Sequence, residues 1–195
     1  MSADSGPTAD SQQVNVIFLI DASLDVTGSD FVKEKDFVKS VARSLELPLN
    51  ETKIAAIPYG ASVKSGILNT YQTLSEFDRD VDSLQRLTGS RRMDEALKAT
   101  RNILRREKAA ERNIVILLTA GRQAVGYRGV LLTNSGKGAM EAGAEIFVVA
   151  IGKAHSVDEL KSIVLSSQDI YQIGSFNYLQ REARPIGKDI RNGKC

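Results

Sequence analysis

Continuous apolar runs recur along the chain, and amphipathic segments lie between them. The runs are rich in β-branched and aliphatic residues without polar alternation, which is typical of parallel strands covered on both faces. They span Val14–Ile20, Thr52–Tyr59, Asn113–Thr119 and Glu145–Ile151, with a shorter run at Ile170–Ile173. Segment Ala61–Leu68 alternates instead. This pattern predicts an antiparallel partner for the second strand at a sheet edge, with Gly60 at the turn.

The segments between the runs place apolar residues at helical spacing. In Ser29–Leu45 the predicted apolar side holds Phe31, Val32, Phe37, Val38, Val41 and Leu45. Further helices are predicted over Leu74–Leu84, Met93–Glu107, Leu131–Ala142, Val157–Leu165 and Tyr178–Ile190. This alternation predicts the α/β class: a doubly wound, mostly parallel six-stranded sheet with one antiparallel edge strand and helices on both faces.

Composition and length indicate one domain with short ends. The 195 residues are 42% hydrophobic and 26% charged, which is enough to build one sizeable core. The polar stretch 1–13 predicts a flexible leader, residues 14–191 a single domain, and residues 192–195 a tail.

Charge and residue counts exclude several classes of function. The net charge of +2 is spread along the chain, so no basic face for nucleic acid is expected. No apolar run reaches the roughly 18–20 residues of a membrane span, so no membrane insertion is expected. One histidine and the terminal Cys195 cannot supply a nucleophile with its base, so the chain is not expected to be an enzyme. Cys195 could pair only between chains.

Oxygen-bearing side chains follow the first apolar run directly. Asp21, Ser23 and Asp25 lie within five residues at the carboxyl end of a predicted strand. This is the edge where open α/β sheets bind ligands, and such oxygens suit a hard divalent cation.

Several stretches together resemble the von Willebrand factor type A domain over about residues 14–190. They are Val16–Ser23, Lys53–Tyr59, Ser62–Leu68, Asn113–Gly121 and Ala142–Gly152, followed by Val157–Leu160, and they agree with the family in order and spacing. The resemblance implies a doubly wound fold and a metal-ion-dependent adhesion site whose ligands come from three loops.

The five ligand positions of that family site are only partly retained. They hold Asp21, Ser23, Asp25, Arg91 and Ala120. The first two match, and the third replaces a serine oxygen with a carboxylate. Arg91 stands where the family has threonine, and Thr88 reaches that position only with a three-residue shift. Ala120 stands where the family has aspartate, so two ligands are lost.

These substitutions predict a vestigial site without a bound metal or other cofactor. Ala120 offers no ligand, and the charge of Arg91 would repel a cation. A guanidinium fits carboxylates well, so we hypothesise that Arg91 or Arg92 pairs with Asp21 or Asp25 in place of the metal. The alternative is a Mg²⁺ site.

The resemblance implies a non-enzymatic protein–protein interaction or adhesion module of an extracellular matrix or cell-surface protein. Its partner would be a matrix component such as collagen, or another domain of this type, bound without a divalent cation. Candidate contact residues are Arg91, Arg92, Arg122, Tyr127 and Arg128. Asn50 heads the glycosylation sequon Asn50-Glu51-Thr52, which favours secretion over a cytoplasmic location.

Two alternatives stay open. One is a metal-dependent adhesion receptor domain, like the integrin inserted domains, that binds a partner carboxylate through Mg²⁺. The other is an intracellular assembly domain of the same family.

Overall fold

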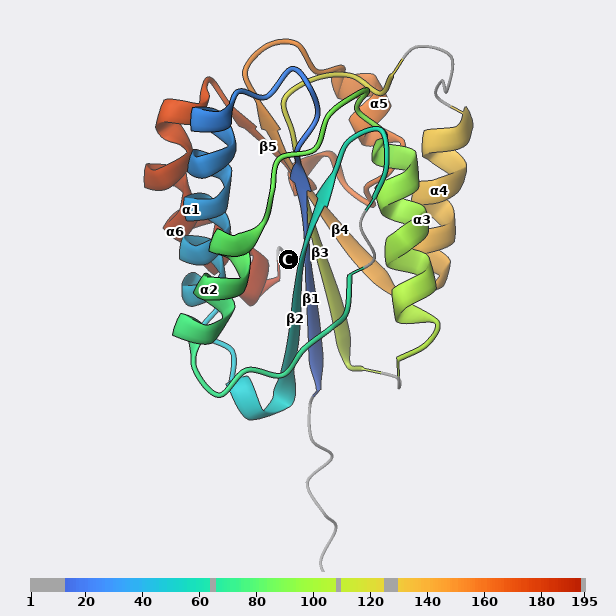
Figure 1. The fold of residues 1–195 in the computed structure, drawn as a ribbon. Helices are drawn as coiled ribbons and strands as arrows, with labels where there is room; N and C mark the ends of the chain where they lie inside the picture. The colour runs from blue at the N-terminus through green and yellow to red at the C-terminus, as the bar shows by residue number, and fades with distance from the viewer. Residues whose placement is uncertain (1–12, 64–65, 108–109, 125–129, 194–195) are drawn as a thin grey trace, which may run out of the picture.

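A single parallel sheet forms the centre of the molecule (Figure 1). The computed structural model describes residues 13–63, 66–107, 110–124 and 130–193. The strands are β1 (Val14–Asp21), β2 (Thr52–Tyr59), β3 (Arg112–Thr119), β4 (Ala144–Ile151) and β5 (Ile170–Ile173). Their spatial order is β2-β1-β3-β4-β5, and all neighbours pair in parallel. Strand β2 lies beside β1 toward one edge of the sheet, and β3 lies beside β1 toward the other edge. The direction in which strands are added therefore reverses between β1 and β3.

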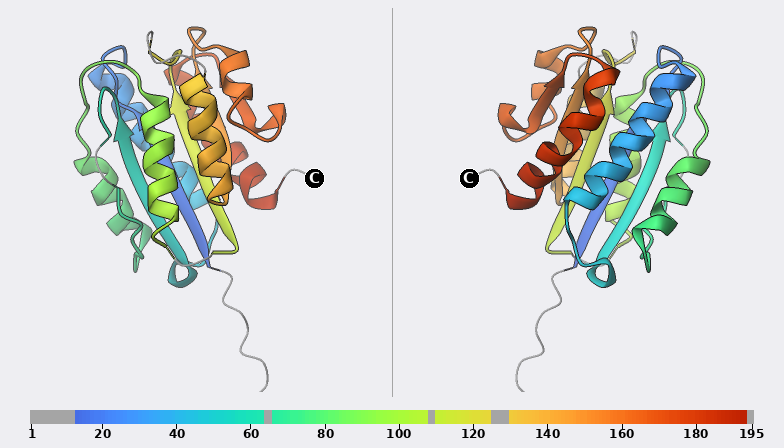
Figure 2. Two further views of the ribbon diagram at one scale, coloured as in Figure 1. Left: turned by 90° about the vertical axis from the view of Figure 1, so that its right-hand side faces the viewer. Right: turned by 90° about the vertical axis from the view of Figure 1, so that its left-hand side faces the viewer.

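Helices cover both faces of this sheet, as the two views of Figure 2 show. One face carries α1 (Gly28–Ser44), α2 (Leu74–Ser83) and α6 (Leu179–Asn192), and the other carries α3 (Met93–Leu104), α4 (Val130–Glu141) and α5 (Val157–Lys161). Single 3₁₀ turns lie at Leu49–Glu51, Ser167–Asp169 and Phe176–Tyr178. No helix in the described part of the chain is both long and apolar enough to cross a bilayer.

Two apolar cores lie on either side of the sheet because successive side chains of a strand point to opposite faces. Phe18 of β1 packs in the core that contains Phe37 and Phe77. Its neighbour Leu19 packs in the other core, with Met93 and Leu97. Strand β1 is buried along its whole length, and β3 and β4 along most of theirs, which explains why these sequences are continuous apolar runs.

The α/β class and doubly wound arrangement are confirmed, but the prediction of six strands with an antiparallel edge strand is wrong. Among the described residues beyond β2, two isolated antiparallel bridges replace the ladder: Tyr59 with Val63 and Ile54 with Asn69. Ile54 exchanges both backbone hydrogen bonds with Asn69, at 2.8 and 3.1 Å. Pro58 lies an even number of residues further on, so it faces the same open edge but has no N–H to donate.

Two helices differ from their predicted form. In α1, Val32 is 50% exposed, whereas Glu34 is completely buried. Helix α5 ends at Lys161, before the predicted end at Leu165, although Ile163 and Val164 beyond it are buried. The apolar residues after Lys161 are therefore spaced as in a helix but are buried in the turns that follow α5. The predicted leader, apart from Gln13, and Cys195 lie outside the described residues.

Candidate interaction site at the carboxyl edge of the sheet

Three loops meet at the carboxyl ends of β1 and β3, at the top of Figure 1. They are residues 22–27 after β1, residues 88–92 before α3 and residues 120–124 after β3. The Leu24 N–H donates to the Gly89 carbonyl at 3.0 Å, which joins the first loop to the second. The Ala124 N–H donates to the Arg91 carbonyl at 2.9 Å, which joins the third loop to the second. The backbone therefore holds the three loops against one another.

A buried ion pair between Asp21 and Arg91 lies at the centre of these loops. Asp21, the last residue of β1, is completely buried, and Arg91 is only 6% exposed. Asp21 Oδ2 accepts hydrogen bonds from Arg91 Nε at 2.5 Å and from the Ala120 N–H at 3.0 Å. Asp21 Oδ1 accepts from the Ser23 N–H at 3.1 Å. The carboxylate is thus satisfied by protein donors from all three loops.

The rest of the Arg91 guanidinium is held less tightly. Nη1 lies 3.3 Å from Oδ2 of Asp25, whose side chain is 75% exposed, whereas Nη2 is buried without a hydrogen-bond partner among the described residues. Burial opposes the charge of Arg91, but the charge of Asp21 and its hydrogen bond outweigh that effect and raise the Arg91 pKa. The guanidinium lies on Gly121, where a Cβ would be 2.3 Å from Nη1. Any side chain at position 121 would therefore displace it.

A second buried acid, Glu34, lies beneath this pair on α1. Both of its carboxyl oxygens are buried without a hydrogen-bond partner in the described ranges. Burial, and then the charge of Asp21, raises the pKa of Glu34 well above its ordinary value, while Arg91 has a smaller opposite effect. The sequence analysis missed Glu34, although it lies midway between Phe31 and Phe37 on the apolar stripe of the helix.

Arg92, the other candidate for pairing with Asp21 or Asp25, instead contacts Asp94 at the start of α3. Its Nε and Nη2 donate to the two Asp94 oxygens, each at 2.8 Å. Gln123 Nε2 of the third loop also donates to Asp94, at 2.6 Å. Burial disfavours ionisation of Asp94, but these donors outweigh it and lower the Asp94 pKa. The network fixes the third loop on α3, and sequence reasoning missed the part of Gln123.

The remaining predicted site residues lie in different places. Arg122 is exposed on the third loop and lines a cavity of about 320 Å³ with Leu24, Asp25 and Arg91. Asn50 is exposed in the turn before β2, at the opposite end of the sheet. Tyr127 and Arg128 lie outside the described residues.

The groups at this edge do not fit a Mg²⁺ ion while Arg91 is in place. Mg²⁺ requires near-octahedral oxygen ligands. Oxygens of this kind come from Asp21 at the end of β1, from Asp25 of the first loop and from the Ser23 hydroxyl, which is buried without a protein partner in the described part of the chain. The second loop instead places the Arg91 guanidinium on Asp21, and from the third loop the Ala120 N–H donates to the same carboxylate.

Comparison with known proteins identifies the family. The model of the von Willebrand factor type A domain matches residues 15–183, so the chain belongs to this family, as its motifs predict. Matrilin-1 of Gallus gallus is 26% identical over 186 residues, covering 90% of this chain and 36% of matrilin-1. The collagen alpha-6(VI) chain of Mus musculus is 22% identical over 185 residues, covering 92% of this chain and 8% of that protein. The chain therefore spans about a third or less of these relatives.

Solved structures share the fold. The proximal thread matrix protein 1 of the mussel byssus superimposes with a TM-score of 0.82 at 20% identity, covering 91% of this chain and 48% of that one. Another structure of the mussel protein, with a TM-score of 0.79 and the same identity and coverage, has a zinc-occupied metal-ion-dependent adhesion site. At this identity the likeness establishes the fold alone.

Proposed function

We propose that this chain is a non-enzymatic protein-interaction module of an extracellular matrix or cell-surface protein, and that it binds its partner without a divalent cation. The partner is a matrix component such as collagen, or another domain of the same family. The family match and the relation to matrilin and collagen VI chains support the class of function. The binding surface is the carboxyl edge formed by the three loops.

The Asp21–Arg91 pair is the observation that supports binding without a cation. In this arrangement the carboxylate that a metal would need is already bonded to a protein cation and to two backbone N–H groups. An incoming cation would have to displace Arg91 and leave a guanidinium buried without its counter-charge, which is costly. The partner therefore meets a surface on which Arg122 is exposed and no metal ion is bound.

Surface plasmon resonance tests this function. The chain is passed over immobilised collagen VI microfibrils and over an immobilised second copy, in Mg²⁺ and again in EDTA. We expect saturable binding to at least one surface, with equal affinity in both buffers. The Arg122→Ala variant should lose about 2 kcal/mol, roughly 30-fold in affinity, as expected for an interface anchor.

The other outcomes contradict specific parts of the proposal. Loss of binding in EDTA would favour the metal-dependent adhesion receptor. Absence of binding to either surface would contradict the proposed partner class. Full affinity of Arg122→Ala would place the interface away from the third loop.

A further inference from the structure

A cavity lies between the three loops at the carboxyl edge. It has a volume of about 320 Å³ and is lined by residues 24–25 of the first loop, 89–91 of the second, and Arg122 and Ala124 of the third. The hydrogen bonds between the loops fix its walls before any partner arrives. Its size suits one or two side chains of a partner, not a whole helix.

Two arginines give this cavity its chemistry. Asp21 positions Arg91 by accepting from its Nε, and Nη2 is buried, so Nη1, which only the exposed Asp25 approaches among the described residues, is the nitrogen left for a partner's acceptor. Arg122 is exposed, and among the described residues neither a hydrogen bond nor an ion pair ties it down. A planar guanidinium with free N–H groups is best matched by a carboxylate, which can accept two bonds at once.

The contact between Asp25 and Arg91 indicates that the cavity can hold a carboxylate. Its carboxylate lies 3.3 Å from Arg91 Nη1, longer than the 2.7–2.9 Å of a firm charge-assisted hydrogen bond, and its side chain is 75% exposed. Such a contact is weak and easily exchanged. Leu24, at 63% exposed, lies beside it on the rim and offers an apolar surface to a partner.

We propose that this cavity binds the carboxylate of an acidic side chain of a protein partner, which displaces Asp25 and pairs with Arg91 and Arg122. An apolar residue next to that acid packs on Leu24. The inference rests on the proposed function and deepens it, because it names the chemistry that the module recognises. A basic partner residue on Asp25 is disfavoured, since two guanidinium groups share the cavity.

Peptide titration followed by NMR tests this site. The probe is the peptide acetyl-Gly-Glu-Leu-Gly-amide, and the matched control replaces its Glu with Gln. We expect the Glu peptide alone to shift the backbone amides of Leu24, Gly89 and Ala124. Asp25→Asn should tighten binding about 3- to 5-fold, because it removes a competing exposed ion pair. Arg122→Gln should weaken binding by at least the same factor.

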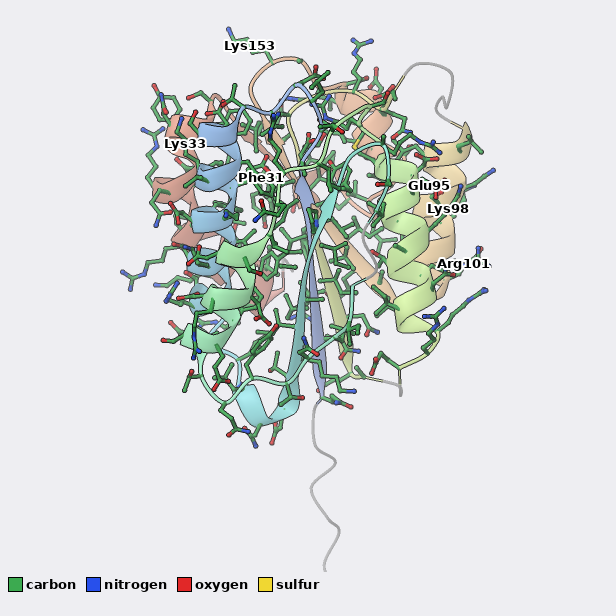
Figure 3. The ribbon with its side chains drawn as sticks, in the orientation of Figure 1. Phe31, Lys33, Glu95, Lys98, Arg101 and Lys153 are labelled. Atoms are coloured by element: carbon green, nitrogen blue, oxygen red, sulfur yellow. The ribbon has the colours of Figure 1, made fainter. Side chains whose placement is uncertain are left out.

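Lys153→Gln is the matched control variant, because Lys153 is an exposed cation at the same edge but outside the cavity (Figure 3). It should leave the affinity unchanged. Equal shifts from the Glu and Gln peptides, equal shifts from inorganic sulfate, or weaker binding by Asp25→Asn would each overturn the proposal. Failure here with intact binding to matrix surfaces would leave the interaction module standing and remove only the carboxylate site.

Discussion

At the scale of single residues, Arg91 is the side chain that contacts all three loops of the carboxyl edge. It bonds to Asp21, approaches Asp25 and covers Gly121, so one side chain joins all three loops. A buried pair of this kind adds little net stability over apolar packing. Removing one partner is different, because the other charge is then left buried without compensation.

Arg91→Met is therefore expected to lower the free energy of unfolding by about 3 kcal/mol, the low end of the range for a broken buried pair. Asp21 would keep only its two backbone N–H donors. Urea unfolding measures the change, with Arg122→Gln as the exposed control, expected within about 0.5 kcal/mol of the unaltered chain. Equal stability of the Arg91→Met variant would contradict a stabilising role of the Asp21–Arg91 contact.

The same residues predict a gain of function. Arg91→Thr combined with Ala120→Asp removes the protein cation and adds oxygens at the two positions where the family carries ligands. We expect the double variant to bind Mg²⁺ with a dissociation constant below about 1 mM. Isothermal titration calorimetry measures it, and circular dichroism verifies the fold. If the double variant is folded but does not bind Mg²⁺, Arg91 is not the group that excludes the metal.

At the scale of elements, helix α1 carries an acid on the face that it buries. It begins after Thr27, whose side chain accepts from the Asp30 N–H at 3.1 Å, and the following turns pack Phe31 and Phe37 into the core. Glu34 lies on the same stripe, beneath Asp21. The helix therefore tolerates a group whose ionisation opposes its own burial.

The stability of the chain should consequently fall as pH rises above the ordinary Glu34 pKa of 4.5. Because the folded pKa is raised, the native state holds a proton that the unfolded chain releases, which costs about 1.4 kcal/mol per pH unit until the folded pKa is reached. Glu34→Gln removes this dependence. Urea unfolding of both proteins from pH 5 to pH 8 should show the variant gaining relative stability with pH. Parallel curves would contradict burial of a neutral Glu34.

At the scale of the whole molecule, the interaction edge and the glycosylation sequon lie at opposite ends of the sheet. Asn50 lies in the turn before β2, at the end of the sheet that is at the bottom of Figure 1. Asp21 is the last residue of β1, at the opposite end of the sheet, and Arg91 contacts it there. Asn50 is exposed, so a glycan there would extend away from the proposed binding surface. The architecture is thus compatible with both secretion and binding.

If the chain is expressed through a secretory pathway, we expect a glycan on Asn50. Mass spectrometry before and after enzymatic deglycosylation detects it, and Asn50→Gln provides the unmodified control. Both forms should bind a partner equally at the carboxyl edge. An unoccupied Asn50 in secreted protein would remove the support that the sequon gives to an extracellular location.

Much of the fold could be predicted from the sequence because the strands of a doubly wound sheet are unmistakably apolar. Asn113–Thr119 and Glu145–Ile151, for example, lie within strands of the structure. The prediction of a strand at Ala61–Leu68 was wrong because alternating side chains do not by themselves make a strand pair. Pairing with β2 also needs backbone N–H donors along its open edge, and Pro58 has none.

The residues of the site could be predicted from the sequence only where their type and their position in a loop indicated which group they contact. Counting along the loops placed Arg91 at the missing threonine, and the structure brings it to Asp21. Glu34 was hidden, because a charged residue within a helix is normally read as exposed. Arg92 pairs with Asp94 because both lie in one turn at the start of α3, and the sequence prediction did not include this local contact.

Whether Arg91 occupies the place of the metal is measured by titrating the unaltered chain with Mg²⁺ in an isothermal titration calorimeter. We expect no saturable heat from the unaltered chain, and binding by the Arg91→Thr/Ala120→Asp variant under the same conditions. Stoichiometric binding by the unaltered chain with a dissociation constant below about 100 µM, within reach of oxygen-ligand sites, would contradict it.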